Sequence, residues 1–177
     1  SGVNTAYHRA IKKKIAKAIK ELVEQTREVE LDGSYQKIDP RGLCKDSRNP
    51  TVIDPDLAAL RFKAKNGDTV ATIVNWSCHP EVMGPTSRLI TADFPGPLCE
   101  RVEEKSGGTC VYLSGSIGGL MTPDSRAENF YEVTRIGASV ADLALKGLEN
   151  PTASEKKAAL GWRFEIIRIP VENSRYL

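Results

Sequence analysis

One of the two histidines in this 177-residue sequence stands where a layered protein places functional side chains. His79 lies in NWSCHPEVMGPTSRLITADFPG, residues 75–96, after strand-forming residues and before a proline. Functional groups gather beyond the carboxyl ends of strands, and a neutral imidazole is the commonest metal ligand. Position alone favours a histidine that only hydrogen-bonds at a strand end over a metal ligand. The other histidine, His8, lies in a basic segment and is expected at the surface, so no complete set of metal ligands is visible.

The other candidate groups are an aspartate, a threonine and a glycine-rich turn. Asp93 stands near the predicted start of a helix, where the structural role of a cap is favoured over a place in the lining of a site. The turn GSIGGLMTPD, residues 115–124, follows an apolar strand, and Gly118 and Gly119 leave backbone N–H groups open to an oxyanion. It lacks the lysine of a P-loop and the spacing of a dinucleotide fingerprint, so nucleotide binding is not expected. Thr122 offers a hydroxyl, but no feature of the sequence places a base beside it.

These residues need a frame of helices and strands to position them. Apolar residues at steps of three and four predict amphipathic helices, over residues 5–28 with Asn4 as N-cap, 92–105 and 128–148. Apolar runs bounded by turn residues predict strands, over residues 28–35, 57–64, 69–78, 109–116 and 159–171. An Asn-Gly pair joins two of these strands in a tight hairpin. The alternation predicts one α/β domain over residues 1–177, a mixed β-sheet flanked by amphipathic helices.

The overall composition narrows the choice of partners. The formal net charge is +2, and the one basic stretch, residues 9–20, is followed at once by acidic residues, so we expect no nucleic-acid partner. No apolar run approaches the ~20 residues that cross a bilayer. The four cysteines form no CxxC pair, which makes a zinc cluster built from them improbable. An even count still permits two disulfides, so the cellular compartment stays open.

Several segments, in this order along the chain, resemble the neutral/alkaline (non-lysosomal) ceramidase family and its bacterial relatives. They are NTAYHRAIKKKIAKAIKELV, IDPDLAALRF, NWSCHPEVMGPTSRLITADFPGPLCERVEE and VYLSGSIGGLMTP, which together cover most of the chain. The block from NWSCHP to ITADFPG is the most specific of them. The resemblance implies a hydrolase of lipid amides such as N-acylsphingosine.

The resemblance also implies roles for particular residues. It makes His79 a zinc ligand and favours that role over simple packing at a strand end. Thr122 aligns with a serine that acts beside the zinc in ceramidases, whereas Leu120 replaces an aspartate of the family's turn, which puts mechanism and substrate in doubt. An arginine of the family that binds substrate is best matched by Arg48, with Arg41 as the alternative.

Other family motifs do not occur in this sequence. A histidine-rich HTHSGP-like motif upstream, and a glutamate and a tyrosine well downstream, complete the family's active site. The sequence therefore predicts the central part of a larger catalytic domain, inactive by itself and without tight zinc binding. Two hypotheses remain open: a zinc-dependent hydrolase of an amide bond that carries part of its active site here, and a non-catalytic module that kept the fold. The true substrate and the oligomeric state are also open.

Overall fold

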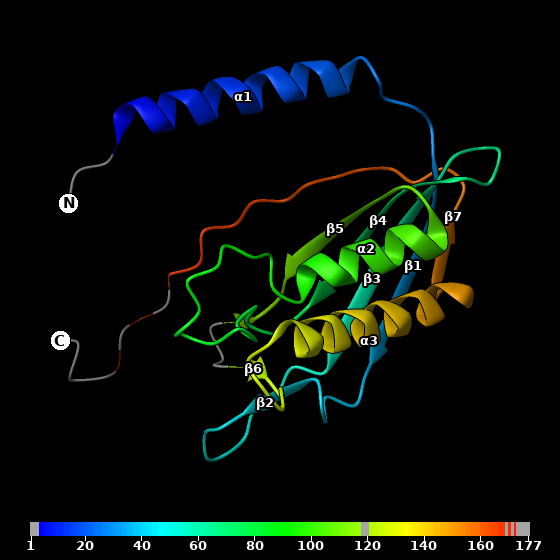
Figure 1. The fold of residues 1–177 in the computed structure, drawn as a ribbon. Helices are drawn as coiled ribbons and strands as arrows, with labels where there is room; N and C mark the ends of the chain where they lie inside the picture. Colours follow the sequence, from blue (N-terminus) through cyan, green and yellow to red (C-terminus); the bar gives the residue numbers. More distant parts are fainter. Residues whose placement is uncertain (1–3, 118–120, 169, 171, 173–177) are drawn as a thin grey trace.

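The computed structural model describes residues 4–117, 121–168, 170 and 172 (Figure 1). Its helices are α1 Thr5–Val23, α2 Pro95–Ser106 and α3 Phe130–Glu149. Its strands are β1 Glu30–Lys37, β2 Cys44–Asp46, β3 Asp56–Lys63, β4 Thr69–Trp76, β5 Thr109–Ser114, β6 Met121–Pro123 and β7 Ala153–Glu155. Asn4 caps α1 as predicted, because its side chain accepts a hydrogen bond from the Tyr7 N–H at 3.0 Å. No helix among the described residues is long and apolar enough to span a membrane.

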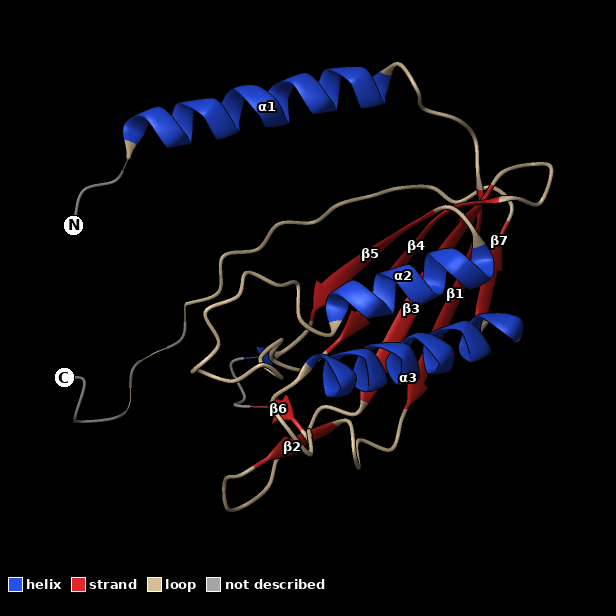
Figure 2. Cartoon of the chain, in the orientation of Figure 1, coloured by secondary structure: helices blue, strands red, loops and turns tan. Residues whose placement is uncertain are grey.

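The predicted mixed sheet is confirmed. Five strands lie in the order β5-β4-β3-β1-β7, and β2 and β6 form a separate two-stranded ribbon (Figure 2). Strands β4 and β5 are parallel, whereas the other neighbours in the sheet are antiparallel. The β3–β4 hairpin turns at Asn66-Gly67, where Gly67 has a φ of 91°, a backbone angle that glycine adopts without strain. The chain is therefore an α/β protein, and the loops that carry the candidate residues follow the carboxyl ends of the parallel strands β4 and β5.

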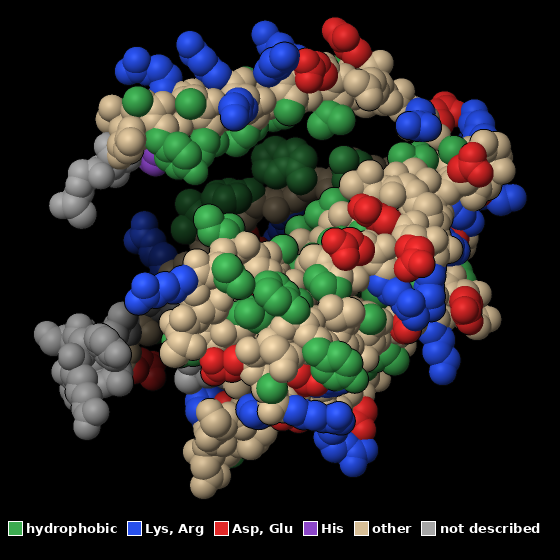
Figure 3. Space-filling view, viewed as in Figure 1, with side chains coloured by type: hydrophobic (Ala, Val, Ile, Leu, Met, Phe, Trp, Pro, Cys, Tyr) green, Lys and Arg blue, Asp and Glu red, His purple; other side chains and the backbone are tan. Residues whose placement is uncertain are grey.

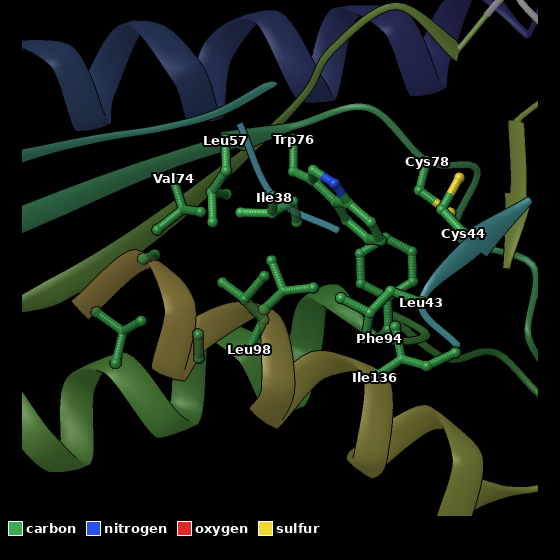
Figure 4. Close-up of a cluster of buried hydrophobic side chains, with 14 of the residues drawn as sticks. Ile38, Leu43, Cys44, Leu57, Val74, Trp76, Cys78, Phe94, Leu98 and Ile136 are labelled. Carbon is green, nitrogen blue, oxygen red and sulfur yellow. The ribbon is translucent and has the colours of Figure 1, made fainter. Parts of the chain in front are cut away.

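The core lies between the sheet and helices α2 and α3. Trp76 and Phe94 meet edge to face with ring centroids 5.5 Å apart, and Phe94 meets Tyr112 in the same way at 5.6 Å. Figure 4 shows this aromatic contact at the centre of the buried side chains. Gly137 lets α3 approach α2 closely, since a Cβ at this position would lie 2.5 Å from the Phe94 carbonyl oxygen. The end of β4 is thus fixed by packing to the beginning of α2.

The opposite face of the sheet is left open by the described residues. Leu60, Val111 and Leu113 are 39%, 43% and 48% exposed there. Helix α1 has no buried residue and lies apart from the sheet (Figure 1). Its lysines point outward while its apolar side chains gather on the side toward the sheet (Figure 3). Helix α1 therefore adds little to the packed core.

Most predicted bounds differ from the structure by a few residues, and one predicted strand is not found. Helix α1 ends at Val23 rather than residue 28, and α2 begins at Pro95 rather than residue 92 because Asp93 has a φ of 54°, outside the helical range. The closing strand predicted over 159–171 is wrong for the residues described there. The last strand of the sheet is β7, which pairs with β1 before the chain leaves the sheet. The alternating apolar residues beyond it, such as Trp162 at 90%, are exposed, and none of the described residues after β7 lies in a strand.

Candidate functional site

The candidate site lies where the parallel strands β4 and β5 end. Trp76 and Ser114 are paired at these ends, so the segments that follow both strands emerge side by side. The His79 backbone N–H donates to the Met121 carbonyl oxygen at 3.0 Å, which brings the loop after β4 onto β6. Strand β6 is antiparallel to β2, with Thr122 opposite Lys45. The backbone segments that carry His79 and Thr122 therefore lie together at one end of the sheet.

A cavity of about 480 Å³ opens beside Thr122. Its polar lining comprises Lys45, Glu81, Thr122, Ser125 and Glu128. Apolar surface comes from proline and valine side chains in the same loops. His79 is not among the described residues that line this cavity, although its backbone contacts β6. The site thus offers a hydroxyl, an ammonium group and two carboxylates around one hollow.

Asp93 holds the loop that forms one wall of this cavity. The side chain is 4% exposed, and its carboxylate accepts from the backbone N–H groups of Val82 and Met83 at 3.1 Å and of Phe94 at 2.8 Å. Val82 itself lines the cavity. The structure therefore gives Asp93 a positioning role between the loop after β4 and the start of α2.

Ser77 links three segments at the ends of β4 and β5 and was missed by the sequence reasoning. Its hydroxyl donates to the Asp54 carboxylate at 2.7 Å and accepts from the Ser116 N–H at 2.8 Å. The residue is 2% exposed. Its position two residues before His79 was the available signal, but only the fold brings Asp54 and the turn after β5 to it. Ser77 fixes the start of the glycine-rich turn against the end of β4.

A buried ion pair holds the loop after β6, and the sequence did not reveal it either. Glu132 is 2% exposed, and its carboxylate is bound by the Arg135 guanidinium at 2.7 Å and by the Arg126 N–H at 2.9 Å. These hydrogen bonds lower the pKa of Glu132 to about 2. Arg135 also donates to the carbonyl oxygens of Gly42 and Asp124. The pair therefore joins α3 to both sides of the β2–β6 ribbon.

The two arginines considered as substrate-binding residues are each paired with an aspartate two residues earlier. The Arg48 guanidinium contacts the buried Asp46 carboxylate at 2.8 Å, and hydrogen bonds from this arginine and from the Val52 N–H hold the pKa of Asp46 well below its usual range. Arg41 pairs with Asp39 in the same way and is 89% exposed. Arg48 remains the better candidate, because Asp46 is paired with Met121, next to Thr122.

The described residues do not form a complete metal site. Within them, no group of three or more histidine, cysteine, aspartate or glutamate side chains is placed to hold a metal ion. His8 is exposed on α1, as expected. Gly118 and Gly119, predicted to offer backbone donors, lie outside the described residues. Among the described residues, His79 thus stays a candidate zinc ligand that belongs to no group of three or more ligating side chains.

The similarity of the chain to known proteins is structural. No family model and no curated protein match the sequence. Two similar solved structures are a neutral ceramidase from Pseudomonas aeruginosa and a ceramidase complexed with C2, each with a TM-score of 0.60 and 18% identity. Each comparison covers 71% of this chain and 23% of the other, so the chain spans about a quarter of the length of these structures. At this identity the similarity shows that the fold is shared.

Proposed function

We propose that this chain forms one wall of the active site of a ceramidase-like hydrolase that cleaves an amide bond in a lipid. The observation that carries the proposal is the contact between the His79 loop and the strand that bears Thr122, at the carboxyl ends of two parallel strands. The folds of two ceramidases support it. The proposal includes the status of residues 1–177 as part of a larger catalytic domain.

The lining of the cavity suits the hydrolysis of an uncharged carbonyl compound. Attack by water on an amide needs a proton acceptor for the water and a donor for the oxyanion that develops. The carboxylates of Glu81 and Glu128 are the acceptors at hand, and the Thr122 hydroxyl is a donor. The Lys45 ammonium group also lines the cavity, and it forms an ion pair with the Asp124 carboxylate at 3.5 Å. In this proposal these groups orient the amide and stabilise the charge that forms on its oxygen.

Zinc belongs to the proposal only through His79. A catalytic zinc takes about three protein ligands and a water, and a zinc ion activates water and polarises a carbonyl group. Because the described residues contribute a single candidate ligand, the remaining ligands would come from elsewhere in the protein. We therefore assign His79 the role of one ligand and derive no step through the metal.

A second function is supported by a different observation. The sequence has Leu120 where the ceramidase family has an aspartate, and the described residues hold no metal-binding group. Both features suit a module that kept the fold and binds an apolar amide without cleaving it. This alternative predicts binding in the same cavity but no turnover.

The two functions are separated by an assay of the full natural protein that carries this sequence. N-acylsphingosine with a fluorescent acyl chain is the substrate, and His79→Ala, Thr122→Ala and Thr122→Ser are the variants. The proposal expects Thr122→Ala to lower kcat/KM by about 100-fold, the usual effect of losing one oxyanion donor, and Thr122→Ser to keep most of the activity. Thr26→Ala is the matched control, because Thr26 is exposed and the described residues give its hydroxyl one hydrogen bond, to the Val23 carbonyl oxygen.

Each outcome of this assay decides between the functions. Turnover that is lost in His79→Ala and Thr122→Ala and kept in Thr26→Ala supports the hydrolase. Turnover that both site variants retain shows that the active site lies elsewhere. No turnover by the wild-type protein, even with zinc supplied, favours the binding module.

A further inference from the structure

The four cysteines of the chain lie in two contacting pairs. Cys44, at the start of β2, lies against Cys78 in the loop after β4, and its thiol donates a hydrogen bond to the carbonyl oxygen of Ser77, the neighbour of Cys78, at 3.9 Å. Figure 4 shows these two sulfur atoms next to each other at the edge of the core. Cys99 on α2 lies against Cys110 on β5, and the interaction between the two thiols lowers the pKa of Cys99 and raises that of Cys110. All four are present as free thiols.

Simple packing explains a buried cysteine but not this arrangement. A free cysteine behaves as a small apolar residue, so a single thiol in a core does not indicate a function. Here every cysteine has a cysteine partner, and each partner belongs to a different element of the fold. Four cysteines can be joined in three ways, and the structure selects one of them. Thiols in contact need only a small movement to reach bonding distance.

We propose that the chain carries two oxidisable dithiols, which close as Cys44–Cys78 and Cys99–Cys110 disulfides. The oxidant is a low-molecular-weight disulfide such as glutathione disulfide. One cysteine thiolate attacks it and releases one small thiol, and the paired cysteine then attacks the mixed disulfide and releases the second. Each pair loses two electrons and two protons, which the oxidant takes up. This inference does not depend on the proposed catalytic function.

The exposure of the two pairs predicts the order of the reaction. Cys99 is half-buried, whereas Cys44 and Cys78 are 3% and 0% exposed. An external disulfide therefore reaches Cys99 from solvent, while the other pair reacts only when the structure opens locally. The Cys99–Cys110 disulfide should form first.

The buried pair, Cys44 and Cys78, has the larger consequence for the candidate site. Cys78 is adjacent to His79, and Cys44 is adjacent to Lys45, which lies opposite Thr122 across the β2–β6 ribbon. A bond between Cys44 and Cys78 would tie the His79 loop covalently to the strand that supports Thr122. Oxidation would then fix the relative position of the two candidate residues.

The test uses the purified chain, folded and fully reduced, and then exposed to glutathione disulfide. Two disulfides should lower the intact mass by about 4 Da. Peptide mapping without reduction should find Cys44 joined to Cys78 and Cys99 joined to Cys110. Cys78→Ser should abolish only the first link and Cys110→Ser only the second. The oxidised wild type should melt at least about 5 °C higher than the reduced form.

Three results would overturn the proposal. One is crossed pairing, such as Cys78 with Cys99, in protein that keeps its native circular dichroism spectrum. Another is stable attachment of glutathione at Cys99 without closure onto Cys110. The third is a full count of free thiols after prolonged oxidation, together with a melting temperature that is unchanged or lower. Oxidation in urea gives the reference distribution, since an unfolded chain has no reason to prefer the native pairs.

Discussion

Replacing Ser77 by alanine should destabilise the chain and loosen the contact between the segments that follow β4 and β5. The Ser77 hydroxyl bonds to the Asp54 carboxylate at 2.7 Å and to the Ser116 N–H at 2.8 Å, in surroundings that leave the residue 2% exposed. Hydrogen bonds to a charged group contribute about 1.5–3 kcal/mol, and a buried N–H left without a partner costs about 1–3 kcal/mol. Because the two losses share one hydroxyl and are not additive, we expect a fall of about 2–4 kcal/mol in the free energy of unfolding.

Urea unfolding followed by circular dichroism measures this change. Ser47→Ala is the matched control, because Ser47 is exposed in the loop after β2 and the described structure gives its side chain no hydrogen bond. Its unfolding free energy should stay within about 0.5 kcal/mol of the wild type. A change in Ser77→Ala no larger than in Ser47→Ala would refute the view that this hydroxyl joins the three segments. Amide exchange at Ser116 should also accelerate in Ser77→Ala.

Three further predictions concern the frame around the site. Burial raises the pKa of Asp32, but hydrogen bonds from Lys63, Arg61 and a serine outweigh it and bring the pKa to about 2. The stability that this carboxylate contributes is therefore present above pH 4 and is lost as the pH falls toward 2. In urea titrations, the free energy of unfolding of the wild type should be lower at pH 3 than at pH 6 by about 1–2 kcal/mol more than that of Asp32→Asn. A parallel fall in both proteins would contradict this. Gly137→Ala should cost about 1–3 kcal/mol, because the added Cβ would lie 2.9 Å from the Leu98 nitrogen; a thermal melt that matches the wild type would disprove the close approach. Asp93→Ala should cost about 2–4 kcal/mol in urea and Asp93→Asn less, since the amide still accepts and tolerates a positive φ; equal loss in both variants would argue against the hydrogen bonds.

The helices and strands were predicted correctly from the sequence where a local pattern of residues is enough to form the element. The hairpin at Asn66-Gly67 needs only its own turn chemistry, and α3 needs only its apolar stripe, so both were predicted with small errors in their bounds. The strand predicted over 159–171 failed for the opposite reason. Alternation there predicts a strand face, but a strand also requires a neighbour to supply hydrogen bonds, and the chain has already left the sheet.

The candidate site was readable in part for a similar reason. His79 and Thr122 each follow a strand-forming segment, and their proximity follows once β4 and β5 are parallel neighbours. The groups that hold them there come from distant segments, as with Ser77 and Asp54. A serine or a glutamate in a sequence carries no signal of a partner so far away. Long-range polar contacts of this kind become visible only when the fold is known.

The central claim is that a lipid amide would bind beside Thr122, at the end of the β4–β5 pair. The most direct test is to titrate the 15N-labelled chain with a soluble short-acyl N-acylsphingosine and to follow its amide chemical shifts. The account predicts perturbations that cluster at Glu81, Val82, Gly84, Thr122 and Ser125, which line the cavity, and that weaken in Thr122→Ala. Perturbations confined to the open face of the sheet, at Leu60, Val111 and Leu113, with none at Thr122 would contradict it.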